Sequence, residues 1–307
     1  MRFSLVIAVA PYRNAEILGS IKEMNFPKKN YEIIIEKGTN ASDNRNRGVK
    51  KSKGELIAFL DDDAVADKEL LKNADNFFKK HPEIDIVGGP QLTPLDEKGF
   101  AKISGYVLSS KFGGWSASNR YGKKKLNLNA DDTYLTSAIM FCRKEVMKKI
   151  KFDPNLWPGE DSKFVTDAKK EGFKVAYNPE LIIYHRRRPT LKGLIKQIFN
   201  YGRVGPLREK FSETIKRPFF LIPSLFLIYL VFLGGLFFVI NPILKFIFLF
   251  PLFLYLSLDL LFSAYESIKN KDLRGILFLP FIFPIIHLSY GAGWIYSYLK
   301  KILKRKN

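Results

Sequence analysis

Short apolar runs alternate with polar segments over the first two thirds of the chain. Four of these runs predict buried strands, because they are brief and lack the strict alternation of a half-exposed strand. The segments between them predict helices. The strands are expected at Leu5–Ala10, Glu32–Ile35, Leu56–Leu60 and Ile84–Gly88, and the helices at Ala15–Met24, Asp43–Ser52 and Lys68–Lys80. This alternation predicts an α/β domain with a mainly parallel sheet.

The pattern weakens between Pro90 and Asn129, where Gly, Ser and Lys are common. A stretch of this length without clear periodicity is often a functional loop or lid. Regular structure is expected to return afterwards. The expected elements are strands at Tyr134–Cys142 and Val175–Tyr184, a helix at Glu160–Glu171 that Gly172 ends, and an amphipathic stretch at Leu191–Arg203.

After Pro218 the chain becomes rich in Phe, Leu and Ile for long runs. Phe219–Ile240 has no charge over 22 residues, enough to cross a hydrocarbon core about 30 Å thick. Two more candidate spans follow, and prolines could break the last one into a re-entrant piece and a helix. We expect a soluble domain at residues 1–215 and a membrane domain of two to three helices at 216–307. The later spans are Ile243–Ala264, with Lys245 and Asp259, and Gly275–Leu299, with Pro280 and Pro284.

The distribution of charge leaves the number of membrane crossings open. Three full crossings would put the basic C-terminal residues on the side opposite the soluble domain, which the positive-inside rule disfavours for a cytoplasmic domain. A broken third segment would leave both ends on the cytoplasmic side. We expect an integral membrane protein whose soluble domain faces the cytoplasm at the cell membrane. The basic residues concerned are Lys300, Lys301, Lys304, Arg305 and Lys306.

The chain of 307 residues is strongly basic, with 50 Lys and Arg against 30 Asp and Glu and a formal charge of +20. Such an excess suits an anionic partner. No zinc-finger spacing and no aromatic RNA-binding sheet motif is present, so we expect no nucleic acid partner. With apolar spans in the chain, anionic lipids and phosphates fit better. Cys142 is the only cysteine, which excludes an internal disulfide, and its apolar surroundings predict a buried side chain.

The run Leu56–Leu60 ends in three successive carboxylates, Asp61, Asp62 and Asp63. A buried carboxylate is costly unless a cation pairs with it. Three of them at a strand end therefore suggest a divalent metal with oxygen ligands. Such an ion could bridge a diphosphate and neutralise its charge as it leaves. A solvated acidic turn is the alternative.

Two later segments also carry candidate chemistry. Glu160 and Asp161 follow a turn at a helix N-terminus, where the dipole favours an ionised carboxylate that can accept a proton from an attacking hydroxyl. Ordinary helix capping is the alternative. His185 ends a predicted strand and is a candidate metal ligand, with a structural role as the alternative. The run Arg186–Arg188 can clamp phosphate, or it can face anionic lipid.

Polar residues also follow the first two predicted strands and open the next helix. In parallel sheets, ligands bind beyond the carboxyl ends of the strands, so these residues are predicted to share one edge. Each of them, taken alone, fits an ordinary polar turn. The residues are Pro11, Tyr12, Arg13, Glu36 and Arg45.

Taken in order, these segments resemble family 2 of the inverting nucleotide-sugar glycosyltransferases, which have the glycosyltransferase A fold. The likeness covers roughly residues 3–205 and is strongest with the exopolysaccharide and lipid-linked-glycan branch. The matching segments are Val6–Asn14, Tyr31–Glu36, Arg45–Gly48, Lys53–Asp63 and Gly159–Asp161.

The resemblance implies a role for each candidate residue. Asp61 and Asp63 would form the DxD-type pair that contacts the ribose and a Mg²⁺ or Mn²⁺ ion. Asp161 would be the catalytic base, Glu36 would face the nucleotide base, and His185 would contact the metal or the diphosphate. The remaining candidates are Pro11, Tyr12, Arg13, Arg45 and Asp62 for the nucleotide sugar, Glu160 beside the base, and Arg186, Arg187 and Arg188 for the acceptor phosphate.

The sequence departs from the family pattern at two places. Glu36-Lys37-Gly38 replaces the usual Asp-Asp-Gly, which leaves base selectivity open. Gln197–Arg203 lacks the Gln-x-x-Arg-Trp motif of processive polymerases, which favours single addition. We expect a sugar to pass from a UDP- or GDP-sugar to a lipid-linked acceptor, either a polyprenyl or dolichyl phosphate or a lipid-linked saccharide.

Two other functions remain open at this point. A sugar nucleotidyltransferase also combines an α/β domain with paired carboxylates, but Ala10–Asn14 lacks the glycines expected of its phosphate loop. A non-catalytic membrane scaffold or glycan-binding subunit would keep the fold without the reaction.

Overall fold

The computed structural model describes residues 1–208, 211–236 and 241–303, and these form two compact units. Unit 1 comprises Met1–Glu97 and Ser116–Arg186, and unit 2 comprises Lys98–Trp115 and the described residues from Arg187 onward. The excursion 98–115 and residues 187–215 thus group with the C-terminal helices, which differs from the division expected at residue 215. The functional domain boundary stays a prediction.

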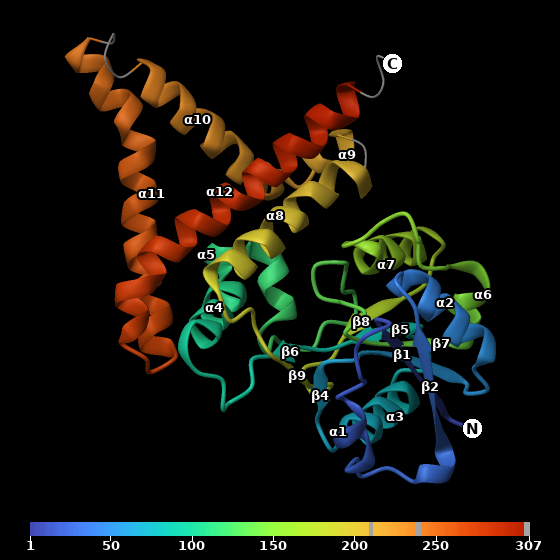
Figure 1. The fold of residues 1–307 in the computed structure, drawn as a ribbon. Helices are drawn as coiled ribbons and strands as arrows, with labels where there is room; N and C mark the ends of the chain where they lie inside the picture. Colours follow the sequence, from blue (N-terminus) through green and yellow to red (C-terminus); the bar gives the residue numbers. More distant parts are fainter. Residues whose placement is uncertain (209–210, 237–240, 304–307) are drawn as a thin grey trace. The chain divides into compact units, whose positions relative to one another are not determined.

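Unit 1 contains a six-stranded sheet of order β2-β1-β3-β7-β5-β8 (Figure 1). Every strand runs in the same direction except β7, which is antiparallel to both of its neighbours. The sheet is therefore mainly parallel, as expected from the alternating pattern. The strands are β1 (Phe3–Val9), β2 (Tyr31–Lys37), β3 (Leu56–Asp61), β5 (Ile86–Gly88), β7 (Ile139–Arg143) and β8 (Val175–Tyr177).

Helices cover both faces of this sheet (Figure 1). Successive residues of β1 point to opposite faces, so Leu5 packs in one core and Val6 in the other. Gly48 of α2 lets that helix approach β1, because a Cβ there would lie 2.4 Å from Val6 Cγ1. One face carries α1 (Leu18–Lys22) and α3 (Leu70–Lys80); the other carries α2 (Ala41–Lys51), α6 (Lys144–Lys149) and α7 (Glu160–Lys170); η1 (Lys28–Asn30) precedes β2.

A second, three-stranded sheet has the order β4-β9-β6. The prediction of one strand at Val175–Tyr184 is wrong, because β8 and β9 lie in different sheets. A turn at Asn178 separates them: its side-chain oxygen accepts from the Glu180 amide at 3.0 Å, and its carbonyl accepts from the Leu181 amide at 3.2 Å. The strands are β4 (Ala64–Ala66), β9 (Ile183–His185) and β6 (Gln91–Leu92).

The stretch Pro90–Asn129 contains regular structure, so the prediction of a long irregular loop is wrong for its middle part. Helix α4 (Gly99–Ser109) buries Ile103 and Val107 and packs against α12 of unit 2. A partner distant in sequence therefore supplies the stability that the local pattern does not reveal. The elements that follow are α5 (Lys111–Gly114) and η2 (Trp115–Arg120). Two other elements are shorter than expected: α1, and β7, which begins only at Ile139.

Unit 2 is helical, and two of its stretches, Leu244–Lys269 and Arg274–Leu303, are long and apolar enough to cross a membrane. Helix α12 continues through Pro280 and Pro284, so the break that was one of the two open alternatives does not occur; buried Phe283 packs this part of the helix. The helices are α8 (Leu191–Arg208), α9 (Phe211–Ile215), η3 (Pro218–Phe220), α10 (Ile222–Leu236), α11 (Pro242–Lys269) and α12 (Arg274–Leu303). The end of the first predicted span, residues 237–240, and the basic residues Lys304, Arg305 and Lys306 lie outside the described residues.

Candidate active site

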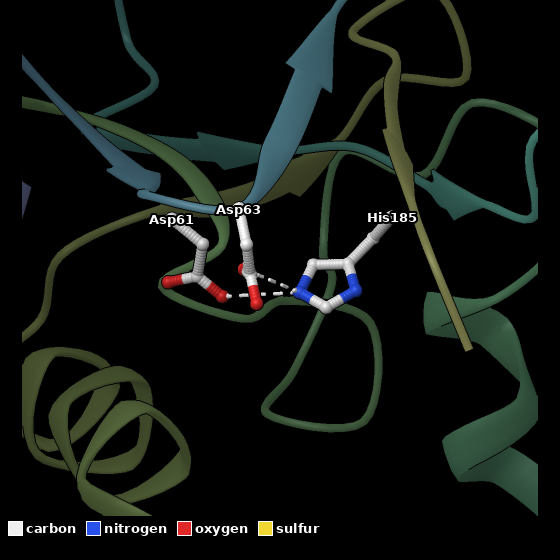
Figure 2. A group of neighbouring side chains, drawn as sticks. All are labelled: Asp61, Asp63 and His185. Atoms are coloured by element: carbon white, nitrogen blue, oxygen red, sulfur yellow. Dashed lines mark ion pairs between the residues drawn. The ribbon is translucent and has the colours of Figure 1, made fainter. Parts of the chain in front are cut away.

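The corner between β3 and β4 brings two aspartates and a histidine together. Asp61 ends β3, Asp63 lies in the turn before β4, and the pairing of β4 with β9 sets Ala64 opposite His185. Figure 2 shows both carboxylates directed at the same edge of the imidazole. His185 Nε2 lies 3.1 Å from Asp63 Oδ1 and 3.8 Å from Asp61 Oδ2. The three ligand atoms lie within 4.8 Å of one another, so they can contact one ion.

The protonation of this cluster follows from its charges. Burial disfavours the charged imidazole, but the hydrogen bond with Asp63 and the negative charges of Asp61 and Asp63 outweigh it and raise the pKa of His185. Burial alone would raise the pKa of Asp63, but hydrogen bonds with His185 and Arg13 outweigh that effect, and the pKa falls below its usual range. Asp63 therefore stays ionised and available to a cation.

Arg13 joins the first strand end to this acidic corner. It lies in the turn after β1, where its amide donates to the Ala10 carbonyl at 3.0 Å. Its guanidinium donates to Asp63 Oδ2 at 2.7 Å and lies 3.3 Å from Asp62 Oδ1. Burial and the charge of Asp63 raise the pKa of Asp62 to about 6, and Arg13 opposes this. The buried Oδ2 of Asp62 has no hydrogen-bond partner among the residues that the structure describes.

The other two candidates from this turn lie at the surface. Pro11 and Tyr12 are both exposed, and 89% of the accessible surface of Tyr12 is open to solvent. The ring of Tyr12 is therefore available for stacking on a planar ligand. Its role in nucleotide binding stays a prediction.

Arg45 of α2 links the acidic corner to the start of α7. Its Nη1 donates to Glu160 at 2.9 Å, its Nη2 lies 3.3 Å from Asp61 Oδ1, and the guanidinium stacks 5.4 Å from the Phe152 ring centroid. Burial, followed by the charge of Asp161, raises the pKa of Glu160 against the opposing effect of Arg45. Because Arg45 is buried and already paired, its position suits a role in fixing the two acids.

Asp161 stands in the first turn of α7, after Gly159. Gly159 has a φ of 107°, a conformation that a side chain rarely adopts. The half-buried Asp161 accepts a hydrogen bond from the Ser162 amide at 2.7 Å. Arg120 supports this turn, donating to Ser162 Oγ at 2.7 Å and to the Asp132 carbonyl. Sequence reasoning missed Arg120, because it lies in a stretch without a recognisable pattern.

Glu36 lies at the same level of the sheet as Asp61, since both pair with Ala8 of β1. It is buried and paired with two cations of α2, Lys51 at 2.5 Å and Arg47 at 3.2 Å. The hydrogen bond with Lys51 is the main reason that its pKa is lowered. Glu36 is therefore an ionised side chain whose partners come from α2. Its predicted role toward a nucleotide base stays a prediction.

The three successive arginines do not gather at one place within a unit. Arg186 closes unit 1, where it is exposed and pairs with Asp96 at 3.0 Å and with Glu97 at 3.5 Å. Arg187 and Arg188 belong to unit 2, where Arg187 is buried and Arg188 is exposed. Their predicted role as a phosphate clamp stays a prediction.

The donor set at the corner fits a divalent cation. Oxygen ligands from two aspartates suit Mg²⁺ and Mn²⁺, and an imidazole nitrogen suits transition metals. The surplus of carboxylates over cations points the same way, because four carboxylates share two arginines and one histidine: Asp61, Asp62, Asp63 and Glu160 against Arg13, Arg45 and His185. An ion held there would relieve their mutual repulsion.

A mixed sheet with an acidic corner at its strand ends, and a carboxylate pair at a neighbouring helix N-terminus, defines a glycosyltransferase of the glycosyltransferase A fold. The model described as glycosyltransferase like family 2 matches residues 1–200, and the chain belongs to this family. The α/β fold, the family and the enzyme class predicted from the sequence are thereby confirmed.

Two characterised relatives and one solved structure are similar to the chain. A dolichyl N-acetyl-alpha-D-glucosaminyl phosphate 3-beta-D-2,3-diacetamido-2,3-dideoxy-beta-D-glucuronosyltransferase of Methanococcus voltae is 25% identical over 302 residues, covering 87% of this chain and 88% of that protein. The minor teichoic acid biosynthesis protein GgaB of Bacillus subtilis (strain 168) is 26% identical over 176 residues, 56% of this chain and 16% of that protein.

The solved structure is the mannosyltransferase PcManGT from Pyrobaculum calidifontis in complex with GDP-Man and Mn²⁺. The two structures superpose with a TM-score of 0.56 at 14% identity, over 98% of this chain and 88% of the mannosyltransferase. At this identity the likeness shows the shared fold.

Proposed function

We propose that the protein is a membrane-bound inverting glycosyltransferase that moves one sugar from a UDP- or GDP-sugar to a lipid-linked acceptor. The observation that carries this proposal is the cluster of Asp61, Asp63 and His185, which Arg45 connects to Glu160 beside Asp161. A cation site and a candidate base thus meet at the carboxyl ends of the parallel strands. Ligands bind at this edge in open α/β sheets.

Asp61, Asp63 and His185 are the residues that hold the cation in this proposal. When bound there, a divalent cation would neutralise the charge that develops on the departing diphosphate. We favour Mn²⁺ over Mg²⁺, because an imidazole ligand is better suited to a transition metal than to Mg²⁺. Tyr12, exposed beside the corner, is proposed to stack on the nucleotide base, and Arg13 to hold Asp63 in position.

Asp161 is the proposed general base. It accepts the proton of an acceptor hydroxyl while that oxygen forms a bond to the anomeric carbon from the face opposite the leaving group. The bond between the anomeric carbon and the diphosphate oxygen breaks, and the nucleotide diphosphate leaves. A phosphate acceptor is already ionised and needs no base. The carboxylate pair therefore favours a sugar hydroxyl on a lipid-linked saccharide as the acceptor.

The proposal of a lipid-linked acceptor is supported by two observations. The Methanococcus voltae relative, named for a dolichyl phosphate-linked substrate, aligns over 87% of the chain. Helix α11 also presents large apolar side chains outward, with Phe246 80% and Phe250 65% exposed, which suits contact with lipid. Lys216 and Arg217, which directly precede η3 and α10, support a cytoplasmic position for unit 1 by the positive-inside rule.

The test is the release of nucleotide diphosphate by the full chain in detergent from a panel of UDP- and GDP-sugars. Each donor is supplied with Mn²⁺ or with EDTA, and with dolichyl phosphate or dolichyl phosphate-linked N-acetylglucosamine as acceptor. We expect one donor to give metal-dependent release with the lipid-linked saccharide, and a product heavier by one sugar in mass spectrometry. Release of pyrophosphate would indicate a nucleotidyltransferase. No release from any donor with either lipid would contradict the proposal.

A further inference from the structure

Helix α12 is covered along its first half by the excursion α4–α5. The Tyr106 hydroxyl donates to Asp272, just before α12, at 3.1 Å. His287, four turns into the helix, donates from Nε2 to the Phe112 carbonyl at 2.8 Å and accepts from the Tyr255 hydroxyl at 2.8 Å. The Phe112 ring stacks on Phe262 and meets Phe283 and His287 edge-on, with centroids 5.0–5.1 Å apart. The excursion is thus held along the first half of α12 at two points, one in α4 and one in α5.

Helix α8 covers the second half of α12 at backbone distance. A Cβ at Gly202 of α8 would lie 2.0 Å from the Tyr290 carbonyl, and one at Gly293 of α12 would lie 2.1 Å from the Phe199 carbonyl. Near the end of α12, Lys301 donates to the Pro206 carbonyl at 2.6 Å. The two helices therefore cannot separate without breaking a close-packed interface.

These contacts decide what a membrane crossing by α12 would require. A crossing takes about 20 residues, and any such stretch of α12 brings α4–α5 or α8 into the hydrocarbon with it. Both segments carry cations, which are expensive there. Both also join unit 1 directly in the chain, at residues 97–98, 115–116 and 186–187. The cations concerned are Lys102, Lys111, Lys192, Lys196, Arg203 and Arg208, of which Lys111, Lys192 and Lys196 are exposed.

The hairpin of α10 and the first half of α11, unlike α12 and the segments that cover it, carries very little charge over its described residues. From Leu244 to Leu258 the only charge is Lys245, at the start, and Asp259 follows about 21 Å further along the helix axis. Helix α10 carries no charge at all and exposes apolar side chains such as Val231, 68% open to solvent. This hairpin can therefore enter hydrocarbon without carrying polar segments with it.

We propose that α12 lies along the membrane surface on the side of unit 1, and that α10 with the first half of α11 crosses the bilayer as a hairpin. The polar side of this surface layer comes from α4–α5 and α8, while α12 turns an apolar stripe toward the lipid. The stripe consists of Leu277, Phe281, Leu299 and Leu303, each more than half exposed. Lys300 and Lys301 then lie on the side of unit 1, as the positive-inside rule favours. The inference rests on the proposed membrane attachment and not on the donor or the acceptor.

The test is thiol labelling of single-cysteine additions in sealed membrane vesicles of known orientation. Lys271→Cys lies just before α12 and Lys300→Cys in its last turn, and both replace exposed lysines. Asn241→Cys marks the far end of the hairpin, and Lys28→Cys marks the side of unit 1. The wild-type chain, whose one thiol at Cys142 is buried, gives the background. Labelling in denaturing detergent gives the total thiol for each variant.

With a membrane-impermeant maleimide, we expect cysteines 28, 271 and 300 to react from one side and cysteine 241 from the other. Reaction of cysteines 271 and 300 from opposite sides would overturn the proposal, because α12 would then cross. A cysteine at 300 that reacts only in denaturing detergent would overturn it as well, and so would a cysteine at 241 that reacts from the side of unit 1. Labelling requires no turnover, so its result is separate from the test of the transfer reaction.

Discussion

Asp63 in unit 1 and Asp272 in unit 2 are both held by neighbouring donors, but their surroundings differ in balance. Asp272 is one carboxylate with three donors: Arg274 at 2.6 Å, Tyr106 at 3.1 Å and Lys102 at 3.8 Å. Asp63 shares Arg13 and His185 with two further carboxylates. The cluster at Asp272 can fix structure by itself, because its one carboxylate has two cations and a hydroxyl as partners. A surplus of buried carboxylate calls for a cation from outside.

The largest expected effect comes from the base beside the acidic corner. Asp161→Asn should lower kcat by about 10²- to 10⁴-fold, since it removes proton acceptance but keeps the shape of the side chain. The KM for the donor should change little. Steady-state nucleotide diphosphate release measures both quantities. Asp167→Asn is the matched control, the same change six residues later on α7, where the carboxylate pairs with Lys163 one turn earlier.

Asp167→Asn should keep wild-type turnover. Full turnover by Asp161→Asn would show that Asp161 is not the general base.

The buried pair that joins the corner to α7 should matter most for stability. Arg45→Met leaves Glu160 buried without its 2.9 Å partner, which should cost about 3–5 kcal/mol of unfolding free energy. Chemical unfolding followed by circular dichroism measures this loss. The double variant Arg45→Met, Glu160→Gln should recover part of it, because the unpaired charge is gone. A double variant no more stable than the single one would show that Arg45 acts through other contacts.

Asp272→Asn tests the cluster in unit 2, whose one carboxylate already has its partners. It weakens charged hydrogen bonds from Arg274 and Tyr106, so we expect a loss of about 1.5–3 kcal/mol in stability. Turnover per folded molecule should stay at the wild-type level. Thermal unfolding in detergent and nucleotide diphosphate release on the same preparation give both values. A loss of turnover as large as that of Asp161→Asn would mean that the Asp272 cluster takes part in the reaction.

The smallest expected effect concerns metal affinity. His185→Ala removes the nitrogen donor of the cluster and should weaken Mn²⁺ binding by at least about 10-fold, since even loss of a group that only supports a metal ligand costs about 10- to 100-fold. Titration of Mn²⁺ followed by electron paramagnetic resonance measures the affinity without any turnover. His81→Ala, a change on the loop after α3 where the imidazole faces Glu83, is the control. Equal affinity of the two variants would exclude His185 as a ligand.

The sequence allowed the fold of unit 1 to be predicted where buried strands produce continuous apolar runs. Strands β1 and β3 and helix α7 appear within a few residues of their expected bounds. The candidate residues follow the carboxyl ends of β1 and β3 and open α7, so the local pattern that predicted these elements also placed the candidates. The division of Val175–Tyr184 into two strands depended on the turn at Asn178, for which the sequence did carry a signal, the Asn178-Pro179 dipeptide, set inside an apolar run.

Contacts between distant segments account for what could not be predicted. Helix α4 is held by Asp272 and by α12, far along the chain, so its own residues gave no clear period. The approach of His185 to Asp63 depends on the pairing of β4 with β9, which spacing cannot reveal. Arg186 and Arg187 are adjacent in the sequence but belong to different compact units, which their adjacency could not reveal.

The central claim, that the carboxylate surplus holds a catalytic cation, is tested most directly at Asp63. Asp63→Asn removes one negative charge from the corner, while Asp67→Asn makes the same change four residues later, where the carboxylate accepts from the Glu69 amide just before α3. The measurement is Mn²⁺-dependent nucleotide diphosphate release by the two variants and the wild type with the donor that the panel identifies. The account predicts a loss of at least about 100-fold for Asp63→Asn and wild-type release for Asp67→Asn. Equal, metal-dependent release by both variants would contradict it.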